Sequence, residues 1–269
     1  MKLVLQNKKV LILCVIGLAL WLWGINYPYV GTYNANNNYL SLASKNYLRF
    51  GFINLKFFPT YFAGETLPSP VPYYLHHPIL IFPLSAIPYI FFGFQNWVVH
   101  VTNLLFLLGV VFLIYKFADL VWNKKVALWA LGLSMIFPMT SFFWKYIFFE
   151  QSSLFFNLCV YFYLLRYVTQ KKSRYLMLIF VFTFLSGLVD WGVLYLFFPL
   201  IVLFFTKFRK VILRPFMLYL LAAGVSLSLF IVSIYLLQNG FRDLGGAIWT
   251  RSYTAELTKL PFWPIRLIL

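Results

Sequence analysis

The chain has 269 residues, of which 62% are hydrophobic, 22% aromatic and only 10% charged, and its mean hydropathy is +0.83. A water-soluble domain of this size could not cover its surface with so few charged side chains, so the composition predicts an all-α, multi-spanning membrane protein. The net charge of +16 comes from short Lys and Arg clusters between apolar runs, which excludes the continuous basic surface of a nucleic-acid-binding protein.

The apolar runs predict a single membrane domain with about seven transmembrane helices. The first, at 10–26, follows Lys8 and Lys9 and is followed by no small-residue cleavage site, so we expect a retained helix rather than a signal peptide. A long loop, 27–96, contains a shorter apolar run with Pro83 and Pro88. Because proline kinks a helix, we expect 79–94 to lie along the outer interface, or to dip into the membrane and return, rather than to cross it. The remaining spans are predicted at 97–116, 126–144, 151–167, 175–190, 191–206 and 215–238.

The basic connectors predict the orientation of these helices, because short cytoplasmic loops carry an excess of Lys and Arg. Placing four clusters inside assigns 14 of the 22 basic residues to the cytoplasm. The amino terminus is then cytoplasmic, whereas the loop 27–96 and the segment 239–269 lie on the outer face, with five of the six acids. The clusters are Lys2/Lys8/Lys9, Lys116/Lys124/Lys125, Arg166/Lys171/Lys172/Arg174 and Lys207/Arg209/Lys210/Arg214.

Three acids on the predicted outer face, Glu65, Glu150 and Asp190, are candidate catalytic residues, because an ionisable group at a membrane-embedded helix end is costly unless it is used. Two of them have a structural alternative. Glu150 could cap the helix that it begins, where a carboxylate favours the positive end of the dipole. Asp190 could satisfy the backbone groups of a tight hairpin.

Two adjacent histidines, His76 and His77, stand in "YYLHHPILIFP" at the start of the predicted interfacial helix. Adjacent helical side chains point about 100° apart, so we expect only one of them to face a given site. The alternative is a pair that only hydrogen-bonds to the loop. The sequence has no Cys or His cluster with zinc spacing and no phosphate-binding loop. We therefore assign no metal ligands, and binding of a divalent metal ion as a cofactor remains an open alternative.

These residues together fit a substrate with a lipid tail and an anionic head. Lys145, Arg242 or Arg251 could pair with a phosphate at the outer face while a carboxylate deprotonates an acceptor hydroxyl. The polar run "NANNN" would supply further substrate contacts, through Asn34, Asn37 and Asn38.

Three segments in this order resemble the GT-C glycosyltransferases, particularly bacterial relatives of the protein O-mannosyltransferases. The first outer loop of that family reads "Y...A+N.L..G", then "HPPL" and a closing "FG". The segment "WKYIFFEQSS" resembles its second outer loop, and "LVDWG" resembles a "DWP" hairpin with Gly192 in place of proline. The loop matches are Tyr39, Ala43, Lys45, Asn46, Leu48 and Gly51, then His77, Pro78 and Leu80, then Phe92 and Gly93.

The resemblance implies hexosyl or pentosyl transfer from a polyprenyl-phosphate donor to a protein, lipid or glycan acceptor, at the outer face of the plasma (inner) membrane. Complete enzymes of the family continue beyond seven helices, so it implies a truncated segment or a reduced version. The family's first-loop acid is replaced by "YNANNN" here. Either Glu65, Glu150 or Asp190 serves instead, or the chain is a non-catalytic protein that binds the lipid donor or a partner. A transporter or flippase is the less favoured alternative, since no ionisable residues lie at mid-helix.

Overall fold

The computed structural model describes residues 8–26, 35–138, 140 and 149–237, and within these ranges it is all-helical, as predicted. The described residues form no strand, and their one isolated β-bridge joins Thr60 and Tyr73. The α-helices are α2 (Lys8–Leu22), α3 (Ala35–Phe50), α4 (Ile81–Phe92), α5 (Val99–Val121), α6 (Lys124–Ile136), α8 (Phe149–Gln170), α9 (Arg174–Val189), α10 (Phe197–Phe204) and α11 (Arg209–Tyr235), with 3₁₀ turns η2 (Asn96–Val98) and η3 (Trp191–Leu196).

Two stretches of helix are long and apolar enough to cross a membrane: Asn96–Val121, which includes α5, and Arg209–Tyr235, which is α11. They correspond to the predicted spans 97–116 and 215–238. By length and composition the described residues do not support the other five spans. Helix α9 and the stretch Trp191–Phe204 are apolar but shorter than the roughly 20 residues that a span requires, and α8 carries polar side chains along its length.

The predicted continuous helix at 191–206 is divided into η3 and α10, because Pro199 lies in the first turn of α10. Proline has no N–H to donate, and only the first turn of a helix needs no intrahelical donor. The interfacial helix is shorter than the predicted 79–94: α4 begins at Ile81 and ends at Phe92, where Gly93, with a φ of 68°, terminates it. His76 and His77 therefore precede α4 as part of the loop rather than lying on the helix.

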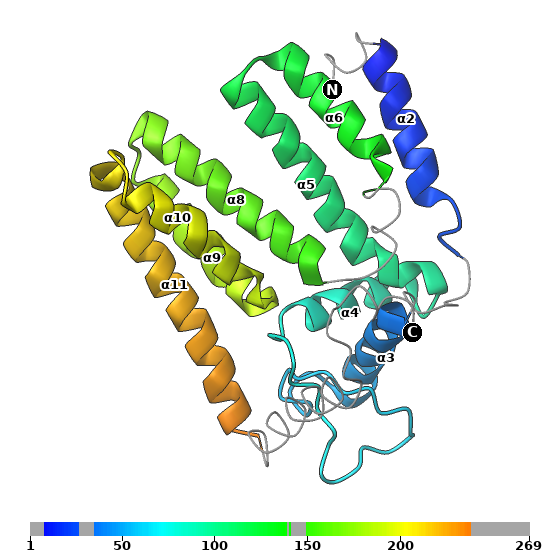
Figure 1. The fold of residues 1–269 in the computed structure, drawn as a ribbon. Coiled ribbons are helices and arrows are strands. Elements are labelled where there is room, and N and C mark those ends of the chain that lie inside the picture. Colours follow the sequence, from blue (N-terminus) through cyan, green and yellow to red (C-terminus); the bar gives the residue numbers. More distant parts are fainter. Residues whose placement is uncertain (1–7, 27–34, 139, 141–148, 238–269) are drawn as a thin grey trace, which may run out of the picture.

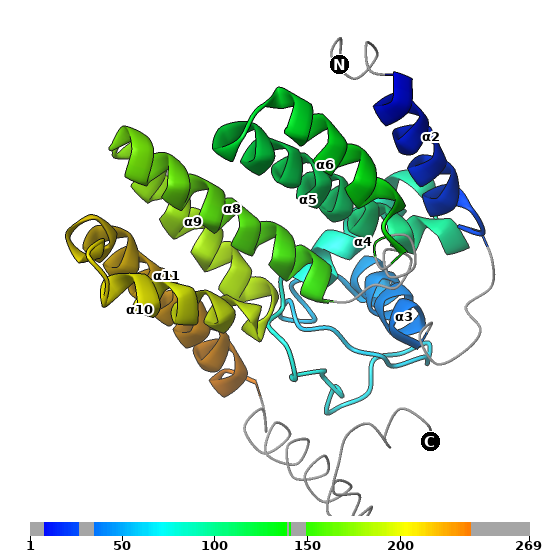
Figure 2. The ribbon, with the colours of Figure 1, turned by 45° about the horizontal axis from the view of Figure 1, so that its top comes forward.

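The helices run between two ends of the molecule (Figures 1 and 2). Helices α2, α5 and α6 pack together, α8, α9, α10 and α11 form a second group, and α5 packs against α8 to join them. The start of α2 and the connectors α5–α6, α8–α9 and α10–α11 lie at one end, at the top and upper left of Figure 1. At the opposite end lie α3, α4 and the loop between them, so the basic connectors and the 35–96 segment are far apart.

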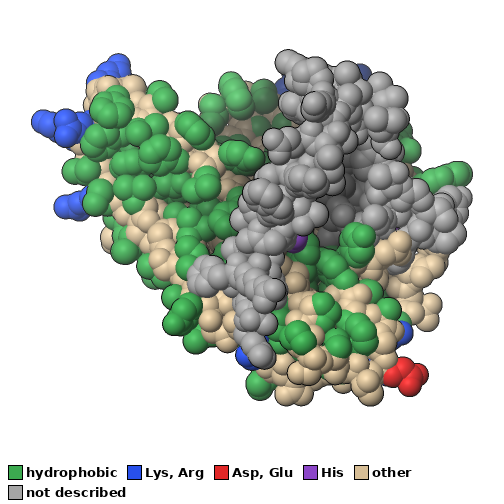
Figure 3. All heavy atoms as spheres, turned by 60° about the horizontal axis from the view of Figure 1, so that its bottom comes forward, with side chains coloured by type: hydrophobic (Ala, Val, Ile, Leu, Met, Phe, Trp, Pro, Cys, Tyr) green, Lys and Arg blue, Asp and Glu red, His purple; other side chains and the backbone are tan. Residues whose placement is uncertain are grey.

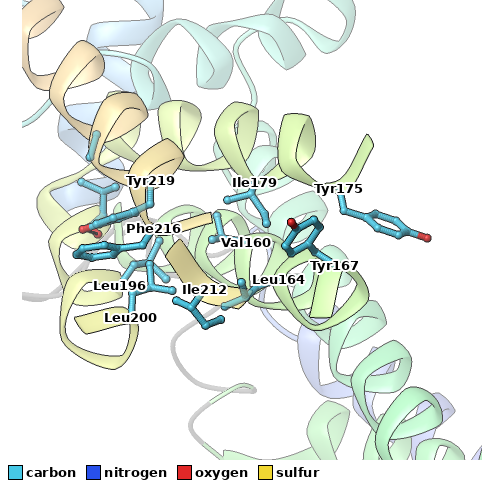
Figure 4. Close-up of a cluster of buried hydrophobic side chains, with 12 residues drawn as sticks. Val160, Leu164, Tyr167, Tyr175, Ile179, Leu196, Leu200, Ile212, Phe216 and Tyr219 are labelled. Atoms are coloured by element: carbon cyan, nitrogen blue, oxygen red, sulfur yellow. Dashed lines mark hydrogen bonds between the residues drawn. The ribbon is translucent and has the colours of Figure 1, made fainter. Parts of the chain in front are cut away.

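Separate apolar cores stabilise the α8–α11 group and the α3–α4 end of the molecule. Tyr219, Phe216, Ile179 and Leu196 belong to a cluster between α8, α9, η3 and α11 (Figure 4). A second cluster joins α3, α4 and the start of α5 and includes Leu40, Ala43, Tyr47, Ile81, Phe82, Ala86 and Val99.

The outer surface of the helices is apolar as well. Hydrophobic side chains cover much of the helical surface in Figure 3, and Lys and Arg gather at its upper-left edge. A contiguous apolar exterior of this kind is rare on soluble monomers, and together with the two long apolar helices it supports association with a membrane. The exposed large hydrophobic side chains on α11 alone are Leu213, Met217, Leu220, Leu221, Val225, Leu229, Ile231, Val232 and Tyr235.

Candidate functional site

The structure brings together His77 and Asp190, which lie 113 residues apart in the sequence. Nδ1 of His77 is 3.0 Å from Oδ1 of Asp190. The His77 side chain keeps 24% of its surface exposed and the Asp190 side chain 13%. A ligand arriving from outside would therefore meet the imidazole before the carboxylate.

The direction of this hydrogen bond follows from the chemistry of the two groups. An ionised carboxylate can only accept, so Nδ1 of His77 carries the hydrogen and donates it to Asp190. In the neutral imidazole Nε2 then keeps its lone pair. The pair has the form of a base oriented by an acid, in which the carboxylate also stabilises the imidazolium after a proton arrives.

Asp190 is held where helix α9 ends. Its own backbone is extended, with φ −162° and ψ 164°, while its N–H still donates to the carbonyl of Ser186 at 3.0 Å. Below it Asn157 of α8 donates to the carbonyl of Gly192 at 3.0 Å and accepts the hydroxyl of Ser186 at 2.7 Å. The hairpin is thus tied to α8 through buried polar groups, which fixes the direction of the Asp190 side chain.

His77 is held by contacts on both of its sides. Its ring stacks on Phe149 with centroids 4.1 Å apart and planes only 9° from parallel, and Tyr74 lies on a similar plane at 6.1 Å. Trp191 Nε1 donates to the carbonyl of His76 at 3.0 Å, and a backbone bond of 2.9 Å joins Leu80 to Leu188. The loop before α4 is therefore fastened to the α9–η3 hairpin on either side of the pair.

Gly192 lies at the closest approach between the hairpin and α8. A Cβ at this position would overlap Oγ of Ser153 and would lie 3.3 Å from Oδ2 of Asp190. The Ser153 hydroxyl is buried and has no hydrogen-bond partner among the described residues. A glycine at this position therefore has a steric reason, whereas the proline of the resembling "DWP" motif would place a ring in the same space.

The other predicted acids are not part of this pair. Glu150 is exposed in the first turn of α8, next to the Phe149 that stacks on His77, and in the described part of the chain its carboxylate has no contact with either member of the pair. That position agrees with its structural alternative as a helix-capping acid. Glu65 is exposed in the loop between α3 and α4 and likewise does not reach the pair within the described ranges.

The predicted substrate-binding residues separate into three groups. His76 takes part through its backbone carbonyl, as above, and its ring lies beside Tyr74 with centroids 5.0 Å apart. Both asparagines lie on α3: Asn37 is fully buried, whereas Asn38 is exposed and lines a groove that contains neither His77 nor Asp190. The remaining four, Asn34, Lys145, Arg242 and Arg251, lie outside the described residues.

Several residues of the loop pattern have an architectural role. Asn46 donates from its amide to the carbonyls of Thr60 and Phe62 at 2.7 and 2.9 Å, which ties the loop to α3. Gly51 has a φ of 88° directly after α3, a conformation that favours glycine. Tyr39 stacks on Tyr61 with centroids 4.8 Å apart. These contacts shape the loop that presents His77.

Sequence reasoning missed Phe149, Asn157 and Ser186 as supports of the pair. A signal for two of them was available, because Asn157 and Ser186 are polar residues inside apolar helical runs, where a side chain needs a partner. Nothing in the sequence pointed to Phe149, which is one of 32 phenylalanines.

The described residues contain no group of three or more His, Cys, Asp or Glu side chains able to hold a metal ion. His77 and Asp190 alone provide two ligands, which is fewer than a protein metal site needs. No family model, no curated protein and no solved structure matches the chain.

Proposed function

We propose that this protein transfers a sugar from a polyprenyl-phosphate donor to an acceptor hydroxyl at the outer face of the plasma membrane, as the resemblance to GT-C glycosyltransferases implies. The observation that carries the proposal is the pair His77–Asp190, with its Nδ1–Oδ1 distance of 3.0 Å. One member lies in the "HPPL"-like segment and the other in the "DWP"-like hairpin, and both were candidates before any geometry was known.

In the proposed reaction, Nε2 of His77 takes the proton of the acceptor hydroxyl. The acceptor oxygen forms a bond to the anomeric carbon of the sugar as the bond from that carbon to the phosphate oxygen breaks. Polyprenyl phosphate leaves with the electron pair of that bond. Asp190 keeps the imidazole oriented and stabilises the imidazolium, a role that general acid–base partners play in other transferases and hydrolases. Lys145, Arg242 and Arg251 remain the predicted partners of the phosphate.

The sidedness of the fold supports the outer location of this chemistry. The basic connectors lie at the end opposite α3 and α4 (Figure 1), and positively charged connectors favour the cytoplasm. On this proposal the amino terminus is cytoplasmic, seven segments cross the membrane at the predicted ranges, and 27–96 lies outside. Shorter helices such as α9 would cross by thinning the bilayer locally.

An apolar groove between α4, α5 and α8 would suit the tail of the donor. It has a volume of about 340 Å³ and is lined by Leu84, Ile87, Pro88, Thr102, Leu105, Phe106 and Phe155. Phe106 of its lining packs against the apolar cluster that includes Phe82, and Phe82 packs edge-on against the Phe149 that stacks on His77.

The proposal is tested with the full chain purified in lipid nanodiscs and a panel of polyprenyl-phosphate sugars, by measuring release of the lipid phosphate. Asp190→Asn and His77→Gln should each lower turnover by about 10²- to 10⁴-fold, the usual contribution of a general base. Asp119→Asn, a change of the same type at the basic-connector end of α5, is the control and should leave the rate unchanged. Near-normal rates in both Asp190→Asn and His77→Gln would refute the catalytic assignment. A wild-type chain that retains a donor without releasing phosphate would favour the non-catalytic alternative.

The topology is tested separately by cysteine accessibility, in a chain whose Cys14 and Cys159 are replaced by alanine. Single cysteines at Glu65 and Gln95 should both react with an impermeant maleimide in intact cells, because 27–96 lies outside on this proposal. A reagent that labels the first and not the second would show that 79–94 crosses the bilayer, and the shared outer face would be lost.

A further inference from the structure

A second concave site lies between α3 and α4, away from the His77–Asp190 pair. Its volume is about 270 Å³. Six of its eight lining side chains carry a hydrogen-bonding group, which sets it apart from the apolar grooves elsewhere on the described surface. The six are Asn38, Ser41, Lys45, Tyr89, Gln95 and Asn96.

Helical periodicity and a turn build this groove. Asn38, Ser41 and Lys45 follow one another at spacings of three and four, so they share one face of α3 beside the face that packs on α4. On the other wall, the chain turns at Gly93, where φ is 68°. That turn brings Phe94 back over Tyr89, with ring centroids 5.2 Å apart.

The two walls are joined at the base by a hydrogen bond of 2.7 Å between the hydroxyls of Ser41 and Tyr89. Above it the Lys45 ammonium lies 6.0 Å from the centre of the Phe94 ring, and no carboxylate pairs with it among the described residues. The groove thus offers two hydroxyls that are hydrogen-bonded to each other, an exposed aromatic ring, side-chain amides and one positive charge.

We propose that this groove binds an anionic saccharide, such as a uronic acid or a sugar phosphate within a glycan. Amides and hydroxyls match the hydroxyls of a sugar ring, an aromatic face packs against its C–H groups, and the ammonium selects a carboxylate or phosphate. The small volume, at the lower end of the roughly 300 to 1,000 Å³ of ligand pockets, suits one monosaccharide unit rather than a peptide. This inference does not depend on the proposed transfer reaction.

Saturation-transfer NMR on the full chain, in nanodiscs of phosphatidylcholine, tests the proposal with methyl glucuronide and methyl glucoside as probes. The acidic sugar should bind more tightly than the neutral one. Lys45→Gln should weaken binding of the acidic sugar by about two- to fivefold, the range of an exposed charge pair, and leave the neutral sugar unaffected. Lys45→Arg should retain the preference. Lys56→Gln, the same change elsewhere in the α3–α4 segment, is the control and should alter neither.

A second variant separates recognition of the ring from recognition of the charge. Asn38 is exposed on a helix, so Asn38→Ala does not endanger folding, and it should weaken both sugars by about two- to tenfold through the lost hydrogen bond. Absence of saturation transfer to either sugar, or equal binding in Lys45→Gln and wild type, would overturn the proposal. Retention of phosphatidylglycerol that depends on Lys45, without sugar binding, would also overturn it in favour of a lipid headgroup.

Discussion

Replacing Gly192 by alanine perturbs the tightest contact beneath the candidate site. The new Cβ would overlap Oγ of Ser153 and would lie 3.2 Å from the Ser153 Cβ and 3.3 Å from Oδ2 of Asp190. The φ of Gly192 does not lie in the left-handed region, so alanine brings no backbone strain. The cost of the substitution is therefore steric, and its largest part is the overlap with the Ser153 hydroxyl, which Ser153→Ala should remove while the two contacts above 3 Å remain.

Gly192→Ala changes the free energy of unfolding through two opposing effects, overpacking in the folded chain and a lower entropy of the unfolded chain. Overpacking of a buried contact costs about 1 to 3 kcal/mol, whereas Gly→Ala stabilises by about 0.4 to 1 kcal/mol through the unfolded chain. Gly192→Ala should then lower the free energy of unfolding by up to about 2.5 kcal/mol. Ser153→Ala removes a hydroxyl that has no partner in the described ranges and should be near neutral. In that background Gly192→Ala should be close to neutral, because only the two contacts above 3 Å then oppose its gain, and this gives a coupling energy of about 1 to 3 kcal/mol.

The four chains of this cycle are compared by denaturant unfolding in detergent micelles. Gly224→Ala is the matched control: a Cβ there meets nothing within 4 Å, so the helix α11 should gain roughly 0.5 to 1 kcal/mol from the better helix former. A Gly192→Ala effect that is the same with serine and with alanine at 153 would refute the reasoning. It would mean that the Ser153 side chain turns away freely and that the hairpin does not need glycine.

Three further outcomes follow from the geometry. Asn157→Ala removes two buried hydrogen bonds and should lower the free energy of unfolding by about 1 to 3 kcal/mol, while Ser233→Ala, an exposed hydroxyl on α11, should stay within about 0.5 kcal/mol, both measured by denaturant unfolding. Burial raises the pKa of Tyr47 and Tyr61 above 10 in the folded chain, so these tyrosines ionise first in the unfolded chain. Their contribution to the free energy of unfolding is therefore complete below pH 10. Above pH 10 the free energy of unfolding should fall by up to about 1.4 kcal/mol per pH unit for each tyrosine. Pairing a pH series of unfolding curves with Tyr47→Phe, which should flatten the slope, checks this. Leu105→Trp narrows the apolar groove and should raise KM about tenfold for a donor with a long isoprenoid tail. This magnitude corresponds to the loss of contact by two methylene groups of the tail, at about 0.8 kcal/mol each. The KM for a donor with a short tail should not change.

The sequence predicted the helical class and most element positions because apolar runs report burial in any apolar environment, whether lipid or protein core. It could not predict which runs are long enough to span. Helix α5 extends to Val121, beyond the predicted end, since the run continues through Ala118 and Leu120 on a face that packs against neighbouring helices. Pro199 divides 191–206 into two helices, and the sequence-based prediction gave this proline too little weight.

For the candidate site, sequence supplied the residues and not their partners. His77 and Asp190 were both singled out, but the contact between them joins the segment before α4 to the hairpin after α9, and no periodicity relates two segments 113 residues apart. Asn38 was placed with the same site because it belongs to the asparagine run. A helix separates neighbours by about 100°, and the structure buries Asn37 while it turns Asn38 into another groove.

On the proposed function, the pairing would take the place of the first-loop acid that the GT-C glycosyltransferases carry and that this chain, which only resembles them, lacks. A carboxylate base must reach the acceptor directly, so an asparagine in its place removes the chemistry. An imidazole can take over that contact if a second group fixes its tautomer, and this second group can lie deeper, where the hairpin buries it. Asp190 is the more buried member of the pair and His77 the more exposed one, which is the order that such a substitution requires. The stacking of His77 on Phe149 keeps the ring in the plane that points Nδ1 at Asp190, so that the opposite nitrogen, Nε2, is the one left for a substrate.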